Sequence, residues 1–384
     1  MKNTTVCFLG LFLLFSIKNH AQEEQNRVIT TSVPFLLIAA DARAAALGDQ
    51  GVASSPDAFS QQWNPAKYAF ATSENGVGFA YTPYLRELVS DIDLGTITYF
   101  NKISDRGAFA ASIRYFGLGG IELRQDLLQE PREVQPNEFA IDLSYALKLS
   151  DEFSMAVTGR FINSNLKIPG IDGDASAANT FGVDVSAFYQ SQTLTFTDFD
   201  GRWRGGLNIS NIGPKLKYDD AGQENFIPTN FRIGGGFDFI LDPSNKISTQ
   251  VEFSKLLVPT PQDFDNDGDI DFDDAQEYNE ISSFGAIFSS WNDAPDGMSE
   301  ELKEVTWALG AEYWYEDSFA FRLGYFSEAE DKGFRKFMAL GAGFKYTAIS
   351  LDVSYLFSTS RVQNPLEGTL RFGLTFNFGG ESAG

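Results

Sequence analysis

The chain has 384 residues and carries 52 acidic side chains against 29 basic ones, a formal net charge of −23, with 36 phenylalanines and 35 glycines. This acidic balance disfavours nucleic acid as a partner. The many aromatic residues and the modest share of charged ones exclude a disordered chain.

The first 21 residues have the pattern of a secretory signal peptide. Lys2 gives a positive start, Val6 to Ile17 form an apolar run, and cleavage after Ala21 would leave Gln22 first. A run of 12 residues is too short for a membrane-spanning helix, which needs about 20.

Removal of this leader would take away the only cysteine and the only histidine of the chain, Cys7 and His20. A mature chain without either residue has no zinc site of Cys or His, no thiol nucleophile, no Ser-His-Asp triad and no haem ligation by these residues. We therefore predict that the protein is not an enzyme.

The residues from Asn75 onward predict an all-β membrane protein. Fourteen segments of 9–13 residues alternate between apolar and polar side chains, which suits tilted transmembrane strands of about 9–11 residues. The fold class expected is a 14-stranded antiparallel outer-membrane β-barrel with an N-terminal plug segment. In the last strand the apolar face consists of Leu370, Phe372, Leu374, Phe376 and Phe378.

The opposite face of these segments carries charges of both signs, which would line a barrel interior where they can pair. A soluble β-sandwich, in which that face meets solvent, is the alternative. The charged residues assigned to the interior are Arg114, Asp142, Arg160, Asp184, Arg204, Asp238, Glu252, Glu312, Arg322, Asp352 and Arg371.

The connections alternate in length, as in bacterial outer-membrane barrels with short periplasmic turns and long extracellular loops. An even number of strands places both ends of the barrel on the periplasmic side, and the connection Gln190–Phe199 is longer than this rule expects. The short turns are Lys102–Arg106, Ser150–Glu152, Asp242–Asn245, Glu316–Ser318 and Thr347–Ala348.

We divide the mature chain into an N-terminal segment, a barrel and a short tail. The barrel spans 73–378, its longest extracellular loop is 258–304, and 379–384 form the tail. The N-terminal segment, 22–72, contains a run of small residues from Ile38 to Gly48, which permits close backbone packing. It would either fill the lumen as a plug or form a periplasmic arm.

The longest loop contains an acidic motif with the spacing of a calcium-binding loop. Counting from Asp263, carboxylates fall at positions 1, 3, 5, 9 and 12, with Gly268 at position 6, where a sharp turn is needed. A structural Ca²⁺ site is expected there, and a solvated acidic loop is the alternative. The candidate ligands are Asp263, Asp265, Asp267, Asp269, Asp271 and Asp274, with Asp269 acting through its backbone carbonyl.

The N-terminal motifs resemble those of the FadL-like barrels, and within that group the PorV family of the type IX secretion system. The motifs are Pro34-Phe35-Leu36, the run Asp41-Ala42-Arg43-Ala44-Ala45-Ala46-Leu47-Gly48, and Asp57-Ala58-Phe59-Ser60-Gln61-Gln62-Trp63-Asn64-Pro65-Ala66.

This resemblance implies a non-enzymatic carrier in the outer membrane of a Gram-negative, Bacteroidetes-like bacterium. It implies as partners the giant translocon barrel, the C-terminal signal domains of secreted cargo, a PorU-type attachment peptidase and outer-membrane lipid. A plugged lumen would conduct nothing, and the apolar wall would contact the translocon. The loops expected to contact cargo are Gly119–Pro136, Ile212–Thr229 and Pro259–Glu304.

Two other functions remain open from the sequence. A FadL-like transporter of fatty acids or other hydrophobic small molecules needs an apolar pocket in the lumen, and an open porin needs a conducting one. The pocket could be built from the apolar residues that share the polar register, namely Phe116, Ile162, Trp314 and Phe326.

Overall fold

A computed structural model gives the fold of the chain. The described residues are 27–86, 89, 91–124, 132–166, 177–218, 224–265, 267–360 and 367–379. The predicted signal peptide, 1–21, and residues 380–384 of the predicted tail lie outside them.

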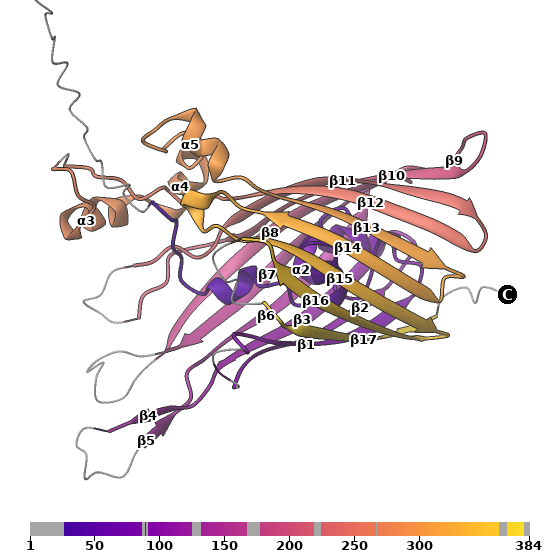
Figure 1. Ribbon diagram of the computed structural model, residues 1–384, viewed down its shortest axis with the longest axis horizontal. Helices are drawn as coiled ribbons and strands as arrows, with labels where there is room; N and C mark the ends of the chain where they lie inside the picture. Colours follow the sequence, from indigo (N-terminus) through magenta and orange to yellow (C-terminus); the bar gives the residue numbers. More distant parts are fainter. Residues whose placement is uncertain are drawn as a thin grey trace, which may run out of the picture.

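Fourteen strands within the described ranges form the closed antiparallel barrel that the sequence predicts (Figure 1). The first and last strands pair with each other, with Asn75 opposite Phe378, and this pairing closes the barrel. The strands are β1 (Asn75–Pro83), β2 (Ile92–Lys102), β3 (Gly107–Leu118), β6 (Asn137–Lys148), β7 (Phe153–Asn165), β8 (Ala178–Gln190), β10 (Asp200–Ile212), β11 (Asn230–Asp242), β12 (Asn245–Leu256), β13 (Thr306–Tyr315), β14 (Phe319–Ser327), β15 (Lys336–Tyr346), β16 (Ile349–Ser358) and β17 (Leu370–Phe378).

The alternation along each strand separates an apolar outer wall from a polar interior. In β17, Leu370 and Phe372 are 49% and 44% exposed, whereas Arg371 between them is 1% exposed. All eleven charged residues that the sequence assigns to the interior are buried. The soluble sandwich is therefore wrong, because its polar face would meet solvent.

The two ends of the barrel differ in the length of their connections, and we call them the short-turn end and the long-loop end. The long connection between β8 and β10 carries a further short strand, β9 (Leu194–Thr195), which pairs with the start of β10. Phe196 and Phe199 of this connection pack against Phe237 on the outer face of β11, with ring centroids 6.2 and 6.4 Å away. The extra length is therefore used to cover an outer-wall aromatic residue.

The long-loop end carries most of the non-barrel structure (Figure 1). A hairpin of β4 (Ile121–Leu123) and β5 (Arg132–Val134) extends the loop after β3. The connection from β12 to β13, residues 257–305, contains three helices, α3 (Phe272–Glu280), α4 (Ser283–Ser289) and α5 (Met298–Lys303), and is called the insertion below. A short helix, η3 (Glu330–Lys332), follows β14. Among the helices in the described ranges, none combines the length and apolar character needed to cross a membrane.

The N-terminal segment runs inside the barrel, where Figure 1 shows it in indigo behind the strands. Its short helices are η1 (Pro34–Leu37), α1 (Ala42–Ala46), α2 (Ser60–Trp63) and η2 (Pro65–Phe70), and most of its side chains are buried. Asp41 caps α1 by accepting a hydrogen bond from the Ala44 backbone N–H at 2.8 Å. Asn64 caps η2 in the same way, and Pro65 follows at the first helical position.

The N-terminal segment enters at the long-loop end and leaves at the short-turn end. Its beginning, residues 27–32, is called the arm; there Arg27 lies 2.7 Å from Glu300 of α5, and the Ser32 backbone N–H donates to the Phe226 carbonyl at 2.9 Å. Its last turn lies at the opposite end, where the Lys102 ammonium donates to the Ala71 carbonyl at 2.8 Å. The alternative, a periplasmic arm, would place residues 27–32 at the short-turn end. They lie at the long-loop end instead.

This path predicts which residues are reachable from outside the cell. Thr30 in the arm and Asp105 in a short turn are both exposed, and the mature chain expected after signal removal has no cysteine of its own. We expect a Thr30→Cys variant to react on intact cells with a maleimide attached to a polymer too large to cross the outer membrane. The matched Asp105→Cys variant should react only after permeabilisation. Equal protection of both positions in intact cells would contradict the path.

Candidate functional site

A buried guanidinium–carboxylate pair joins the N-terminal segment to the barrel. Arg43 of α1 donates from Nε and Nη2 to the two carboxylate oxygens of Glu312 on β13, at 2.9 and 2.8 Å. Glu312 also accepts from Arg322 Nε at 2.6 Å, and Arg43 donates to Asp57 at 2.7 Å. This two-point geometry fixes the orientation of both groups.

Other interior side chains satisfy the backbone of the segment. Glu252 accepts from the backbone N–H groups of Gly51 and Val52, both at 2.8 Å. Arg204 donates to the Ala53 carbonyl at 2.8 Å, and Arg114 donates to the Leu36 carbonyl at 3.1 Å. Irregular backbone at membrane depth needs such partners, because no bulk water is available to it.

Close approach of the backbones requires small residues on the inner wall. A Cβ added to Gly324 of β14 would lie 2.1 Å from the Gly48 backbone nitrogen, and one added to Gly206 of β10 would lie 2.0 Å from the Val52 carbonyl oxygen. Only glycine fits at these two positions. The run of small residues from Ile38 to Gly48 thus meets glycines on the wall, which the sequence alone did not pair with it.

The apolar residues on the interior register are largely used by the N-terminal segment. Phe116 stacks on Phe35 of η1 with ring centroids 6.1 Å apart, and Ile162 is fully buried in the same apolar cluster. Trp314 lies near the Arg322 guanidinium, 5.6 Å from its ring centroid. Of the four residues that could have built a ligand pocket, only Phe326 lines the larger cavity described next.

A cavity lies at each end of the filled lumen, between residues that the structure describes. The larger, about 590 Å³, lies at the long-loop end between the arm and strands β11 to β14, where Leu37, Leu256 and Phe326 contribute apolar lining. The smaller, about 360 Å³, lies at the short-turn end and is lined by charged groups that include Asp57, Arg202 and Lys345.

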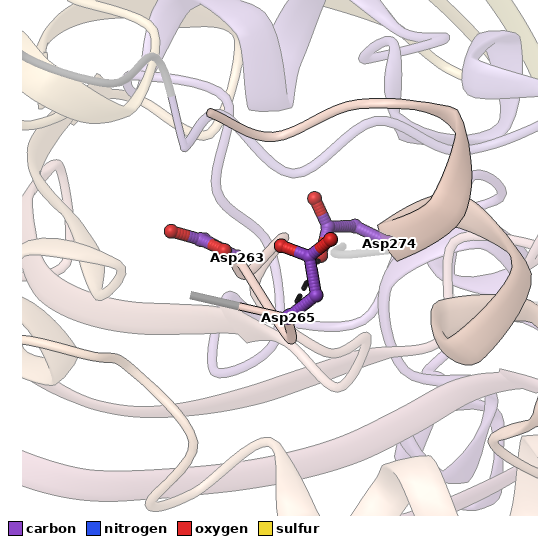
Figure 2. A group of neighbouring side chains, drawn as sticks. All are labelled: Asp263, Asp265 and Asp274. Carbon is purple, nitrogen blue, oxygen red and sulfur yellow. Dashed lines mark hydrogen bonds between the residues drawn. The ribbon is translucent and has the colours of Figure 1, made fainter. Parts of the chain in front are cut away.

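The acidic loop brings three of its six predicted ligands together (Figure 2). Carboxylate oxygens of Asp263, Asp265 and Asp274 all lie within 4.8 Å of one another. The loop turns at Gly268, whose φ of +106° is strained for any other residue, and the Gly268 backbone N–H donates to Asp263 at 2.9 Å.

The other three predicted ligands have local roles in the loop. Asp271 caps α3 by accepting from the Asp273 backbone N–H at 2.9 Å, and Asp267 accepts from the Asp269 backbone N–H at 2.9 Å. Asp269 itself is exposed. The capping box that joins Asp271 to Asp274 explains why the helix begins directly after the acidic run.

The surroundings of Asp265 and Asp274 shift the pKa values of these two carboxyl groups in opposite directions. The backbone hydrogen bond from Asp267 favours the ionised form of Asp265, but desolvation and repulsion from Asp267, Asp274 and Asp263 outweigh it and raise the pKa of Asp265 above its ordinary value. Backbone hydrogen bonds from Asp271, Phe264 and Asp265 lower the pKa of Asp274. A cation among these oxygens would relieve the repulsion.

A second carboxylate group in the insertion was missed by sequence reasoning. Oxygens of Asp293, Glu301 and Glu304 lie within 4.8 Å of one another, and Lys255 of β12 lies 3.0 Å from Glu301. Burial, together with repulsion from Glu301 and Glu304, raises the pKa of Asp293 to about 6. Glu301 and Glu304 share a helix face, but no sequence signal links them to Lys255.

The sequence of this barrel protein matches a known family. The family model described as Type IX secretion system protein PorV matches residues 20–263, which is more than half of the chain. The chain belongs to the PorV family. The match covers the N-terminal segment and nine of the barrel strands, and it ends at Asp263, where the acidic loop begins. No curated protein sequence matches the chain.

Several solved structures are similar to the chain at low sequence identity. A TodX monoaromatic hydrocarbon channel, in a mutant form, matches with a TM-score of 0.51 and 11% identity, covering 88% of this chain and 98% of that one. The Pseudomonas putida toluene transporter TodX matches with a TM-score of 0.49 and 11% identity over 89% and 99% of the two chains. A Pseudomonas aeruginosa FadL homologue gives 0.42 and 13% over 92% and 100%. At these identities the likeness concerns the fold alone.

Membership in the PorV family makes the chain a component of the type IX secretion system, and its barrel places it in the outer membrane. In bacterial outer-membrane barrels, the long loops lie outside the cell and the short turns face the periplasm. The arm and the insertion lie at the long-loop end, which this rule predicts to be the extracellular side.

The pair of Arg43 and Glu312 yields a testable prediction for how firmly the N-terminal segment is held. Glu312→Gln keeps the shape but leaves Arg43 and Arg322 with one carboxylate partner each, Asp57 and Asp352, so we expect the free energy of unfolding to fall by up to about 3 kcal/mol. Urea unfolding in lipid vesicles measures it. Glu330→Gln, at a side chain 66% exposed, is the matched control and should change stability little. Equal stability of both variants would contradict the role assigned to Glu312.

Proposed function

We propose that this PorV family member is a non-enzymatic carrier. It takes the C-terminal signal domain of a secreted cargo from the translocon and delivers it to an attachment complex at the cell surface of a Bacteroidetes-like bacterium. The observation that carries the proposal, beside family membership, is the filled lumen. Because interior side chains are bonded to the N-terminal segment, contact with other proteins falls to the outer wall and the long-loop face.

The long-loop face supports a role in cargo contact by its shape and composition. The β4–β5 hairpin projects from the barrel, and the insertion adds three helices with large exposed apolar side chains (Figure 1). By contrast, the loop after β10 turns inward, since Leu216 and Ile227 are buried in the cluster around η1. Among the three loops predicted to contact cargo, we therefore assign the contact to the hairpin and the insertion.

The outer wall supports lateral docking on the translocon barrel. Its large apolar side chains include Phe109 of β3, Leu143 of β6 and Phe321 of β14, which are 52%, 66% and 60% exposed. Such a wall suits lipid or the apolar wall of another barrel. A PorU-type peptidase is proposed as the recipient of the cargo, and it would supply the catalysis that this chain is proposed to lack.

Deletion and co-purification test this proposal. We expect a deletion strain to lose export of surface proteins while fatty-acid uptake stays normal, because the chain carries proteins rather than small molecules. A copy tagged after Gly379, at the short-turn end, should restore export and should co-purify the translocon barrel and the PorU-type peptidase. A tagged outer-membrane barrel of another family is the control. Normal export with impaired fatty-acid uptake would overturn the proposal.

The cavity at the long-loop end favours one other function. Its volume of about 590 Å³ and its apolar lining suit a hydrophobic small molecule. A FadL-like transporter of fatty acids is therefore the second candidate, and the deletion strain separates it from the carrier. An open porin would conduct ions in planar bilayers, and a lumen filled from Val33 to Ala71 is proposed not to.

We further propose that the acidic loop binds Ca²⁺ and that the ion orders the insertion. Three converging carboxylates, the turn at Gly268 and the helix that begins after Asp271 support a hard cation with oxygen ligands. The raised pKa of Asp265 points the same way, since unrelieved repulsion is the state that binding would remove.

Isothermal titration of the refolded protein tests the calcium proposal. Loops of this kind in extracellular modules bind with a Kd of about 10⁻⁴–10⁻³ M, and we expect an affinity in that range or tighter. Asp263→Asn combined with Asp265→Asn should abolish the binding heat, because two converging carboxylates are lost. The matched control is Asp273→Asn, at a non-ligand position of the same loop. No binding heat for the unmodified chain at millimolar calcium would end the proposal.

A further inference from the structure

The insertion does not sit only above the lumen, because part of it covers the outside of the barrel rim. Phe231 of β11 and Lys255 of β12 are register partners on the outward face, the same face as Ile233. Lys255 is nevertheless only 3% exposed, because Glu301 and Glu304 lie 3.0 and 2.5 Å from its ammonium. The Trp291 ring lies 5.3 Å from that of Phe231, centroid to centroid.

Helix α4 of this overhanging insertion and the turn after it present an aromatic stripe, defined as Phe284, Phe288 and Trp291. Phe284 and Phe288 lie four residues apart on one side of the helix, and Trp291 follows two residues after the helix ends. Phe284 and Phe288 are 69% and 66% exposed, and their rings contact each other at 5.4 Å. No charged residue occurs from Ile281 to Trp291. An uncharged stripe of three aromatic residues this exposed needs an apolar partner.

The stripe is continuous with the lipid-facing wall. Trp291 contacts Phe231 at the rim, and two residues further along β11 lies Ile233, an outward side chain that is 43% exposed. Figure 1 shows α4 and α5 next to the long-loop end of the barrel. The surface next to the stripe is therefore the part of the barrel that lipid surrounds.

We propose that the aromatic stripe of α4 inserts into the outer leaflet of the membrane beside β11 and β12. Aromatic side chains favour the boundary between headgroups and hydrocarbon, and a short helix with one apolar side can lie in that plane. Helix α4 itself carries no charged residue, and the nearest acidic group after the stripe is Asp293, two residues beyond Trp291, so α4 reaches the boundary without bringing a charge. The lipid contact would hold the insertion against one side of the barrel rim.

Fluorescence quenching of labelled single-cysteine variants tests this in vesicles of phosphatidylcholine. Phe288→Cys reports on the stripe, Ile233→Cys on the wall, and Phe272→Cys, at a residue 66% exposed on α3, on water. A quencher on the lipid chains should dim the label at 288 at least about half as strongly as at 233, and dissolved iodide should act mainly at 272. A label at 288 that behaves like the one at 272, or that neither quencher reaches, overturns the proposal.

A second measurement needs no substitution and so does not depend on the variants folding. Chymotrypsin present on both sides of the vesicle membrane should cut the unmodified chain after Phe272 but spare Phe288, because only the second is shielded by lipid. Cleavage after both residues at equal rates would overturn the proposal, and would leave the stripe as a surface for a protein partner.

Discussion

Charge buried at membrane depth must be paired, and this requirement organises the whole molecule. Arg160 is held between Asp142 and Asp184, each a neighbour on an adjacent strand, so part of the interior neutralises itself. Other interior charges are paired with the N-terminal segment: Arg371 lies 2.8 Å from Asp49, and Glu312, which already pairs with Arg322 on the wall, also binds Arg43. The segment therefore completes the electrostatics of the wall as well as filling its volume.

Because the N-terminal segment fills the middle of the lumen, the outer surface of the barrel and its loops are the parts open to binding partners. The backbone of the segment occupies the space next to Gly206 and Gly324, where a side chain would otherwise point inward. The inward ring of Phe116 stacks on Phe35. These glycine and aromatic positions in the middle of the lumen are therefore not available to bind a transported molecule. This arrangement is compatible with a family that works in protein secretion.

The barrel was predictable from sequence because alternation along a strand is local, and residues two apart must face the same way. The path of the N-terminal segment was not predictable, because no local sequence pattern indicates that Arg27 lies beside Glu300. Half of the predicted ligands of the acidic loop lie together, since the carboxylates of Asp263, Asp265 and Asp274 converge. Asp271 does not join them, because its side chain caps α3. Lys255 shows the limit of alternation, because its outward position was buried by the insertion rather than exposed.

The path of the N-terminal segment also bears on the order of assembly. The N-terminal segment is threaded through a ring that the first and last strands of the same chain close. Threading a finished ring would drag Arg43 and Asp57 through a lumen lined with fixed charges. Closing β1 onto β17 around a segment already in place avoids that passage, which makes the β1–β17 seam the natural last step of folding.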